Sequence, residues 1–473
     1  MLTLGSNLTL KGGELDLNSG ATINGGTLHD KGGKFLWKGG TLNGVTLEGP
    51  LNMRNQASIL NIGPNGLVLT GSDGRGPGVA NLSRESELIF RGTQTFDDAT
   101  INLSESNLTA DSTGSGSVLT LGNKITVNVI ARVGRIDGSS VVNNGEINVT
   151  STMTSSGMVI SSNTFTNQGT ITVANGDSLY LLSPSFTNLA AGTLTGGAYE
   201  VDAGSTFTLE NDDTVTTDDA LIILSGVDSV IQTSLSQEVP IEATLTTIGS
   251  AGTLKLLAGR DWTSTLAMTN FGTLVLGGGT FAPGGLTNNG LISGNGVIDV
   301  AVANSGVIRA TSGALDLTRS VTGSGRLKIG AGATLEVDRM AEKSLKATFK
   351  GAGGVLALGQ AGKFNARIAG FAPGDAIDLL GQAATSATLQ AGDKLVIMNG
   401  TQTIATLRLS GDYAGDSFAV ASDGHGGTTI TVSAGLLAQA MASMAPPVAH
   451  AAPLAPSWRP EPARLACPRA MMA

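Results

Sequence analysis

The stretch that determines the fold is Asn143-Asn144-Gly145-Glu146-Ile147-Asn148-Val149, an Asn-x-Gly turn followed by alternating apolar and polar residues. The same element recurs at four more places, whose Asn and Gly positions are Asn167 and Gly169, Asn270 and Gly272, Asn288 and Gly290, and Asn304 and Gly306. From Gly272 the steps to the next two glycines are 18 and 16 residues. Such near-regular recurrence is the signature of a repeat architecture.

A second series supports the same period. Phe165, Phe186 and Phe207 are separated by two steps of 21 residues. Near the N-terminus, glycine pairs at 25–26, 32–33 and 39–40 are seven residues apart, so three short strands with tight turns also make about 21 residues. We expect each such unit to be one coil of a β-solenoid, with the three phenylalanines stacked as a core column rather than a sugar-binding platform.

Strand physics explains why the coils must stack. Alternation places Leu, Ile and Val on one face of each strand and Thr, Asn and Ser on the other. One coil cannot bury its apolar face alone, and the next coil, about 4.8 Å above, completes both the core and the backbone hydrogen bonds. Gly and Asn tolerate the left-handed conformations of sharp corners. We therefore expect the repeated asparagines to form a corner ladder of stacked amides rather than a ligand site.

Composition excludes several other classes of protein. The 473 residues include 67 glycines, while charged residues make up 14% and aromatic residues 4%, which is unlike a helical enzyme. Glycine has no period of three and proline numbers only 14, which excludes collagen, and the 41% hydrophobic content argues against intrinsic disorder. The formal net charge of −9 repels nucleic acid, and the single cysteine, Cys467, excludes a disulfide framework.

The sequence divides into three parts. Residues 1–345 carry the repeats, and a more charged segment at 338–346 interrupts them. Residues 346–432 stay rich in predicted strands but change style, so we expect a β-rich module that caps the open end of the solenoid. Residues 433–473 are dominated by Ala, Pro and Met and are predicted to form a disordered tail.

These repeats resemble known surface proteins. The Asn-x-Gly-x-Ile-x-Val elements and Gly330-Ala331-Gly332-Ala333-Thr334-Leu335-Glu336-Val337 are similar to Gram-negative autotransporter passengers and filamentous-haemagglutinin-like proteins. Residues 407–432 resemble a closing element of large bacterial β-strand-repeat proteins. The resemblance implies an all-β, right-handed parallel β-helix, secretion, and roles in adhesion or biofilm formation.

Acidic clusters are the only candidates for a metal site. Asp212, Asp213, Asp218 and Asp219 put four carboxylates within eight residues, and hard carboxylate oxygens suit Ca²⁺. The Gly-Gly-x-Gly-x-Asp nonapeptide of calcium-binding β-rolls is not repeated, and Asp423 lies in one isolated look-alike. A solvated loop is the favoured interpretation, with calcium as the alternative and no other cofactor expected.

An enzyme is the alternative function. Parallel β-helices also host polysaccharide lyases and hydrolases, which need carboxylates, or carboxylates with Arg or Lys, on one lateral face. Arg260-Asp261-Trp262 combines a charge pair with an aromatic ring that could stack on a sugar, but an ordinary surface loop is the favoured interpretation of this group. His29, His425 and His450 lie far apart, so no catalytic triad is predicted.

The sequence thus favours a non-enzymatic, adhesive β-solenoid at the bacterial surface or outside the cell. Its expected partners are glycans or proteins of host or bacterial surfaces, together with other copies of itself. No apolar run is long enough for a transmembrane helix, and residues 1–13 lack the pattern of a signal peptide. We expect any export signal to lie outside this sequence.

Overall fold

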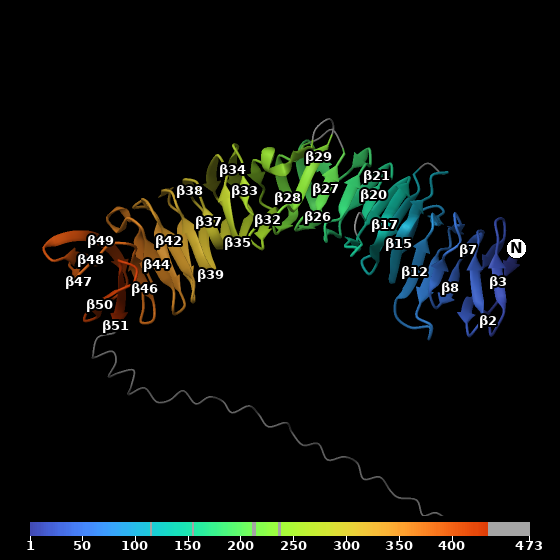
Figure 1. The fold of residues 1–473 in the computed structure, drawn as a ribbon, viewed down its shortest axis with the longest axis horizontal. Helices are drawn as coiled ribbons and strands as arrows, with labels where there is room; N and C mark the ends of the chain where they lie inside the picture. Colours follow the sequence, from blue (N-terminus) through green and yellow to red (C-terminus); the bar gives the residue numbers. More distant parts are fainter. Residues whose placement is uncertain (114–115, 154–155, 211–213, 235–237, 434–473) are drawn as a thin grey trace, which may run out of the picture.

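The computed structural model describes residues 1–433 except 114–115, 154–155, 211–213 and 235–237. The chain forms a gently curved rod of about 17 stacked coils, with 59% of residues in strands and 1% in helix (Figure 1). The predicted all-β solenoid of parallel stacked coils is confirmed. The predicted disordered tail at 433–473 lies, from residue 434 onward, outside the described residues.

Each coil has three sides, which we call face 1, face 2 and face 3 in the order in which the chain passes through them. Face 1 contains β9 (Leu51–Met53), β12 (Gly78–Ser83), the first parts of β15 (Ala99–Ala110) and β17 (Thr126–Gly138), β19 (Glu146–Val149), β22 (Thr170–Val173), the second parts of β26 (Thr193–Asp202) and β28 (Thr217–Ser225), β32 (Thr253–Leu257), the first parts of β35 (Thr273–Ala282), β37 (Leu291–Ile298) and β39 (Val307–Leu317), β41 (Arg326–Gly330), β43 (Lys346–Lys350), β45 (Arg367–Ala369) and the end of β49 (Gln402–Ser410).

Face 2 contains β1 (Leu2–Thr3), β4 (Thr22–Asn24), β7 (Thr41–Asn43), β10 (Ile59–Ile62), β13 (Glu87–Phe90), the second parts of β15 and β17, β20 (Gly157–Ile160), β23 (Ser178–Leu181), β27 (Thr206–Leu209), β29 (Val230–Ser234), β33 (Trp262–Thr263), the second parts of β35, β37 and β39, β42 (Thr334–Val337), β44 (Val355–Leu358) and β46 (Ala376–Leu379). Face 3 contains β2 (Asn7–Leu10), β5 (Thr27–Asp30), β8 (Val45–Glu48), β11 (Leu67–Thr70), β14 (Gln94–Phe96), β16 (Val118–Leu121), β18 (Ser140–Asn143), β21 (Thr164–Asn167), β24 (Ser185–Phe186), β31 (Thr247–Ile248), β34 (Ala267–Asn270), β36 (Gly285–Asn288), β38 (Val302–Asn304) and β40 (Val321–Thr322).

The remaining elements are short. β3 (Glu14–Leu17) and β6 (Lys34–Trp37) pair with each other, β25 (Leu189–Ala190) and β30 (Glu238–Pro240) form antiparallel turns on β26 and β29, and η1 (Ile241–Ala243) and η2 (Ala361–Lys363) are single 3-10 turns. Among the described residues, no helix has the length and apolar character needed to cross a bilayer.

The core is built from columns of register partners. One column on face 1 runs the length of the rod, and every member is buried: Leu51, Ala80, Ile101, Val127, Ile147, Ile171, Tyr199, Ile222, Leu254, Leu274, Ile292, Ile308, Leu327, Ala347, Ile368 and Leu409. Each member touches the one above and below, so each coil is stabilised mainly by its neighbours.

The repeated asparagines form the predicted amide ladder at the corner after face 3. Asn270 donates from Nδ2 to Oδ1 of Asn288 (2.8 Å), and Asn288 donates to Oδ1 of Asn304 (2.7 Å). Asn143 and Asn167 are joined in the same way (2.8 Å). All five side chains are fully buried. An amide can donate and accept, so identical residues satisfy one another down the stack.

The corner glycines have a different cause from the one predicted. None of Gly145, Gly169, Gly272, Gly290 and Gly306 has the left-handed backbone conformation. Instead, a Cβ atom at any of the five would lie 2.0–2.3 Å from a carbonyl oxygen of the preceding coil. These positions are glycine because successive corners are in backbone contact, and any side chain would separate the coils.

The aromatic column is shorter than predicted. Phe165 and Phe186 are register partners on face 3 and stack at 6.2 Å. Phe207 lies on face 2 beside Leu179, and it contacts the other two only through Tyr199. The antiparallel turn formed by β25 and β26 adds residues to this coil. The step of 21 residues from Phe186 therefore ends on face 2 and does not reach face 3. The three rings do pack in the core, but not as one column.

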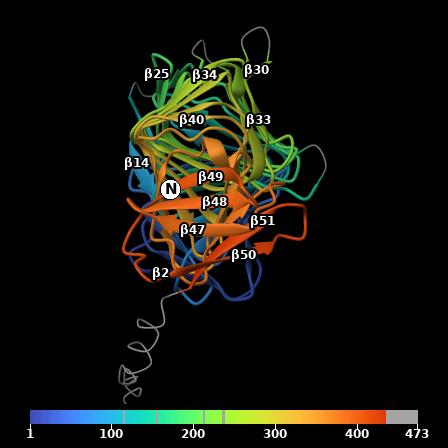
Figure 2. The same ribbon diagram turned by 90° about the vertical axis from the view of Figure 1, so that its left-hand side faces the viewer.

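The C-terminal end is closed by antiparallel strands. Parallel stacking continues past residue 345 through β43, β44, β45 and β46, so the predicted boundary does not coincide with a change in strand pairing. At this end antiparallel pairing begins later, where β47 (Ser386–Gln390), β48 (Lys394–Asn399) and β49 form a meander. β51 (Thr428–Ser433) pairs with β46 on one side and with β50 (Ser417–Ser422) on the other. These strands cross the end of the rod (Figure 2) and cover its last coil.

We predict that Asn288→Ala lowers the free energy of unfolding by about 1–3 kcal/mol, because it leaves buried polar atoms of Asn270 and Asn304 without their partner. The matched control is Asn148→Ala, since Asn148 ends a half-buried row on face 1 where water can replace the lost bond. Urea denaturation of both variants checks the expectation. Equal losses would contradict the importance of the buried ladder.

Candidate functional site

The predicted calcium residues do not form one site in the described chain. Asp212 and Asp213 lie outside the described residues. Asp218 is fully buried, whereas Asp219 is partly exposed and accepts the N–H of Ala251 at 3.2 Å. Because successive strand residues point to opposite faces, these two carboxylates are directed away from each other.

Asp218 occupies an asparagine position of the corner. Its register partners are Leu194 and Ile248, and Ile248 pairs in turn with Asn270. Oδ1 of Asp218 accepts the N–H of Ala220 (2.9 Å), as Oδ1 of Asn143 accepts the N–H of Gly145. Oδ2 has no partner, and burial raises the pKa of Asp218 to about 7. The residue is a corner cap that is less costly when protonated.

The Arg260-Asp261-Trp262 group is held by internal contacts, and its ring lies in the core rather than on the surface. Trp262 is fully buried and packs on Phe281 at 6.2 Å. Arg260 donates to the carbonyl of Ser229 and forms an ion pair with the buried Glu242. Oδ1 of Asp261 accepts the N–H of Thr280 (2.7 Å). No ring of this group is free to stack on a ligand.

Asp423, which lies in the isolated look-alike of a calcium-binding nonapeptide, and Asp97 both stabilise turns. Oδ1 of Asp97 accepts the N–H of Lys124 in the next coil (2.9 Å). Oδ1 of Asp423 accepts the N–H groups of His425 (2.7 Å) and Gly427 (2.8 Å) and so shapes the β50–β51 turn. The histidines stay apart, since His29 lies on β5, His425 lies in this turn, and His450 is outside the described residues.

Sequence reasoning missed a second row of asparagines on the outside of face 1. The outer Asn row comprises Asn52, Asn81, Asn102, Asn128 and Asn148. Each amide donates to Oδ1 of the preceding one at 2.8–3.2 Å. The row is half-buried, and its spacings of 29, 21, 26 and 20 residues obscure it until the register is known.

Further along face 1 the outward positions become basic. Arg326, Lys346, Arg367 and Arg408 are successive register partners, and Arg309 and Lys328 are partners in the adjacent row. We call these six residues the basic rows. The face 1 parts of β39, β41, β43, β45 and β49 contain no Asp or Glu. Within the described chain, no carboxylate lies within 4.0 Å of these cations.

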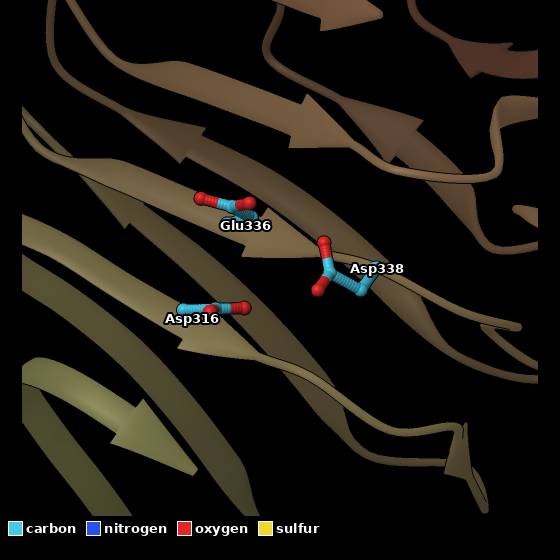
Figure 3. Close-up of side chains that lie close together, drawn as sticks. All are labelled: Asp316, Glu336 and Asp338. Atoms are coloured by element: carbon cyan, nitrogen blue, oxygen red, sulfur yellow. The ribbon is translucent and has the colours of Figure 1, made fainter. Parts of the chain in front are cut away.

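Face 2 of the same coils is acidic. Asp316 and Glu336 are register partners, and ligand atoms of Asp316, Glu336 and Asp338 lie within 4.8 Å of one another (Figure 3). With Asp378 on β46 they form what we call the acidic group. Among the described residues, Asp316, Glu336 and Asp338 are the one set of three acids close enough to share a cation, and their hard oxygen atoms would suit one.

The acidic group carries unmet negative charge. Burial, followed by the charges of Asp316 and Asp338, raises the pKa of Glu336 to about 7. Burial and the charges of Asp338 and Asp299 raise the pKa of Asp316 to about 6. Buried Oδ1 atoms of Asp316 and Asp378 have no hydrogen-bond partner. The cation Arg319 binds Asp299 instead, with Nε 2.9 Å from Oδ1.

A surface hollow lies near the N-terminal end. Its volume is about 330 Å³, and its lining includes Asp30 and Glu48, the cations Lys34 and Arg54, and the ring of Phe35. Glu48 is hydrogen-bonded to Nδ1 of His29. Two carboxylates, two cations and an aromatic ring on adjacent sides of a β-solenoid are a combination suited to an acidic sugar.

Comparison with known proteins adds no assignment, since no family model and no curated protein matches this chain.

We predict that Asp218→Asn stabilises the protein at pH 8. The folded-state pKa of about 7 lies above the usual aspartate value of 3.8, so the free energy of unfolding falls as the pH rises from about 4 to 7. The amide keeps the acceptor for Ala220 and removes the charge, so at pH 8 we expect a gain on the order of 1–3 kcal/mol, and little difference at pH 4.

Denaturation curves at both pH values measure this difference. The neighbouring Asp219→Asn is the control and should have a small effect at either pH, since Asp219 is partly exposed. A loss of stability for Asp218→Asn at pH 8 would show that the buried carboxylate is favourable as it stands.

Proposed function

We propose that this chain is an adhesive β-solenoid of the bacterial surface or extracellular space, which attaches through its lateral faces to surface glycans or proteins. The observation that supports this function is the outer Asn row with its flanking threonines. The row beside it contains Thr100, Thr126, the exposed Glu146 and Thr170, so this half of face 1 presents mainly neutral hydrogen-bonding groups. Binding would be distributed along the rod.

The chemistry of the row suits a glycan. Each amide uses one N–H and one acceptor position within the row, and the second N–H and a lone pair of the oxygen remain for a ligand. The groups repeat at about 4.8 Å along the axis, so a linear chain of hydroxyl groups can meet several of them at once. The sequence resemblance to autotransporter passengers supports the same function.

To test attachment, the protein is applied to a panel of surface glycans and to bacterial and host cells. We expect Asn102→Ala with Asn128→Ala to weaken binding at least about tenfold, a loss of about 1.4 kcal/mol. The control is Thr120→Ala with Thr166→Ala, which removes outward polar groups from face 3 at neighbouring coils. Equal binding by both variants and the wild type would contradict a role for the Asn row.

The second candidate function is cleavage of a polysaccharide, and the hollow at Asp30 and Glu48 favours it. Parallel β-helices place catalytic carboxylates and cations on a lateral surface. Here Glu48, held by His29, is the candidate acid–base group, with Lys34 and Arg54 available to bind acidic sugars.

Purified protein incubated with acidic and neutral polysaccharides tests this candidate through the release of reducing ends or unsaturated products. If cleavage occurs, Glu48→Gln should lower its rate at least about a hundredfold, as expected for loss of an acid–base group. Asp16→Asn, on β3 outside the hollow, is the control. Unchanged cleavage by Glu48→Gln would exclude the hollow, and no cleavage of any substrate would contradict the enzyme.

A further inference from the structure

We propose that the basic rows of face 1 bind the acidic group of face 2 in a second copy of this chain, so that rods associate side by side. This inference does not depend on the proposed attachment function, because it concerns contact between copies at the other end of the rod. It rests on the position of the two charged surfaces along the axis and on the absence, among the described residues, of ion pairs to either surface.

The two surfaces lie on the same coils. β39 carries Arg309 on face 1 and Asp316 on face 2. The next coil carries Arg326 and Lys328 on β41 and Glu336 on β42. Two coils further on, Arg367 lies on β45 and Asp378 on β46.

Neither charged surface has oppositely charged side chains on the strand segments of its own face. The face 2 strands β42, β44 and β46 contain no Lys or Arg, just as the face 1 strands of these coils contain no Asp or Glu. Stacking forces like charges into rows about 4.8 Å apart, where they repel one another. Arg326, Lys346 and Arg367 are exposed, whereas Asp316, Glu336 and Asp338 are partly buried, so long basic side chains can reach recessed carboxylates.

A second rod placed parallel and at the same height meets these requirements. Its face 2 then presents a carboxylate opposite the basic rows at three of the four coil levels from β39 to β45, because both sets repeat with the same coil spacing. The contact uses different surfaces on the two copies, so each added copy still offers an unused face to the next. Association can therefore continue beyond a dimer.

The expected strength follows from the size of the contact. Four coils span only about 20 Å of the axis, which places the contact at the small end of specific interfaces. Exposed ion pairs each contribute about 1 kcal/mol or less and are screened by salt. Association should thus be weak, reversible and strongest at low ionic strength.

A second copy of the chain would compensate both charged surfaces, whereas an anionic polymer would compensate only the basic rows. A polyanion could cover the basic rows but would leave the acidic group unmet. Base-stacking aromatic residues, which single-stranded nucleic acids require, do not occur at the outward positions of β41, β43 and β45.

The test is sedimentation of the full chain over a range of concentrations at about 10 mM and 500 mM salt, where the Debye lengths are about 30 Å and 4 Å. We expect the weight-average mass to rise at least about twofold at low salt and to return to the monomer at high salt. A monomer at low salt at all concentrations would overturn the proposal.

Charge reversal identifies the surfaces. Variant A carries Arg326→Glu, Lys346→Glu and Arg367→Glu, and variant B carries Glu336→Arg and Asp378→Arg. Each alone should stay monomeric, because at the reversed coil levels its face 1 and its face 2 then carry charges of the same sign. A mixture of A and B should associate again, since the glutamates introduced on face 1 of A lie opposite the arginines introduced on face 2 of B at the same coil levels. Failure of the mixture to associate, with both variants folded, would overturn the proposed pairing.

Two further measurements guard against misfolding and a wrong partner. Asp316→Asn with Glu336→Gln removes two of the four carboxylates of the acidic group with little change in shape and should also weaken association. Thr120→Ala and Thr166→Ala, which remove outward-facing hydroxyl groups from face 3, should leave association unchanged. If wild-type chain binds a soluble anionic polysaccharide through the basic rows yet never associates with itself, the polymer is the partner and the proposal is wrong.

Discussion

The structure depends on parallel stacking of coils in register. Each residue lies about 4.8 Å from its register partner in the next coil, so whatever a position contains must be compatible with a neighbour of the same kind. At the five Asn-x-Gly corners after face 3 this constraint selects glycine, because a Cβ atom at Gly290, for example, would overlap the carbonyl of Gly272. In the core it selects aliphatic columns, such as the one from Leu51 to Leu409, that pack against themselves.

The same constraint sorts the outer surface by chemistry. An asparagine can satisfy an asparagine, because its amide both donates and accepts, and this accounts for the buried corner ladder and for the outer Asn row. Arginine and carboxylate rows cannot satisfy themselves. Where the rod carries Arg326 above Lys346, or Asp316 above Glu336, the coil geometry creates charge that only a partner outside that face can compensate. We therefore expect binding to partners where stacking leaves charges or hydrogen-bonding groups without a partner in the same chain.

Much of the fold could be predicted from the sequence, because the period of the corner glycines and the strand alternation both follow directly from stacking. The predicted register was less accurate, since coil length varies. The turn at β25 and β26 moves Phe207 to face 2, and the hairpin of β47 and β48 separates Arg367 from its partner Arg408 by 41 residues. Alternation also buries Trp262, which its local sequence alone did not reveal. The charged rows needed that register, because Arg326 and Lys346 become neighbours only through it.

The most direct test of this account is a pair of distances along one outer row of face 1. Thr172, Ser293 and Thr348 lie in that row, with Ser293 five coils and Thr348 eight coils beyond Thr172. Spin labels on cysteines at these positions, with Cys467 replaced by Ser, should give backbone separations of about 24 Å and 38 Å, a difference of three coil spacings. Two similar distances, or a longer separation for the nearer pair, would contradict stacking in this register.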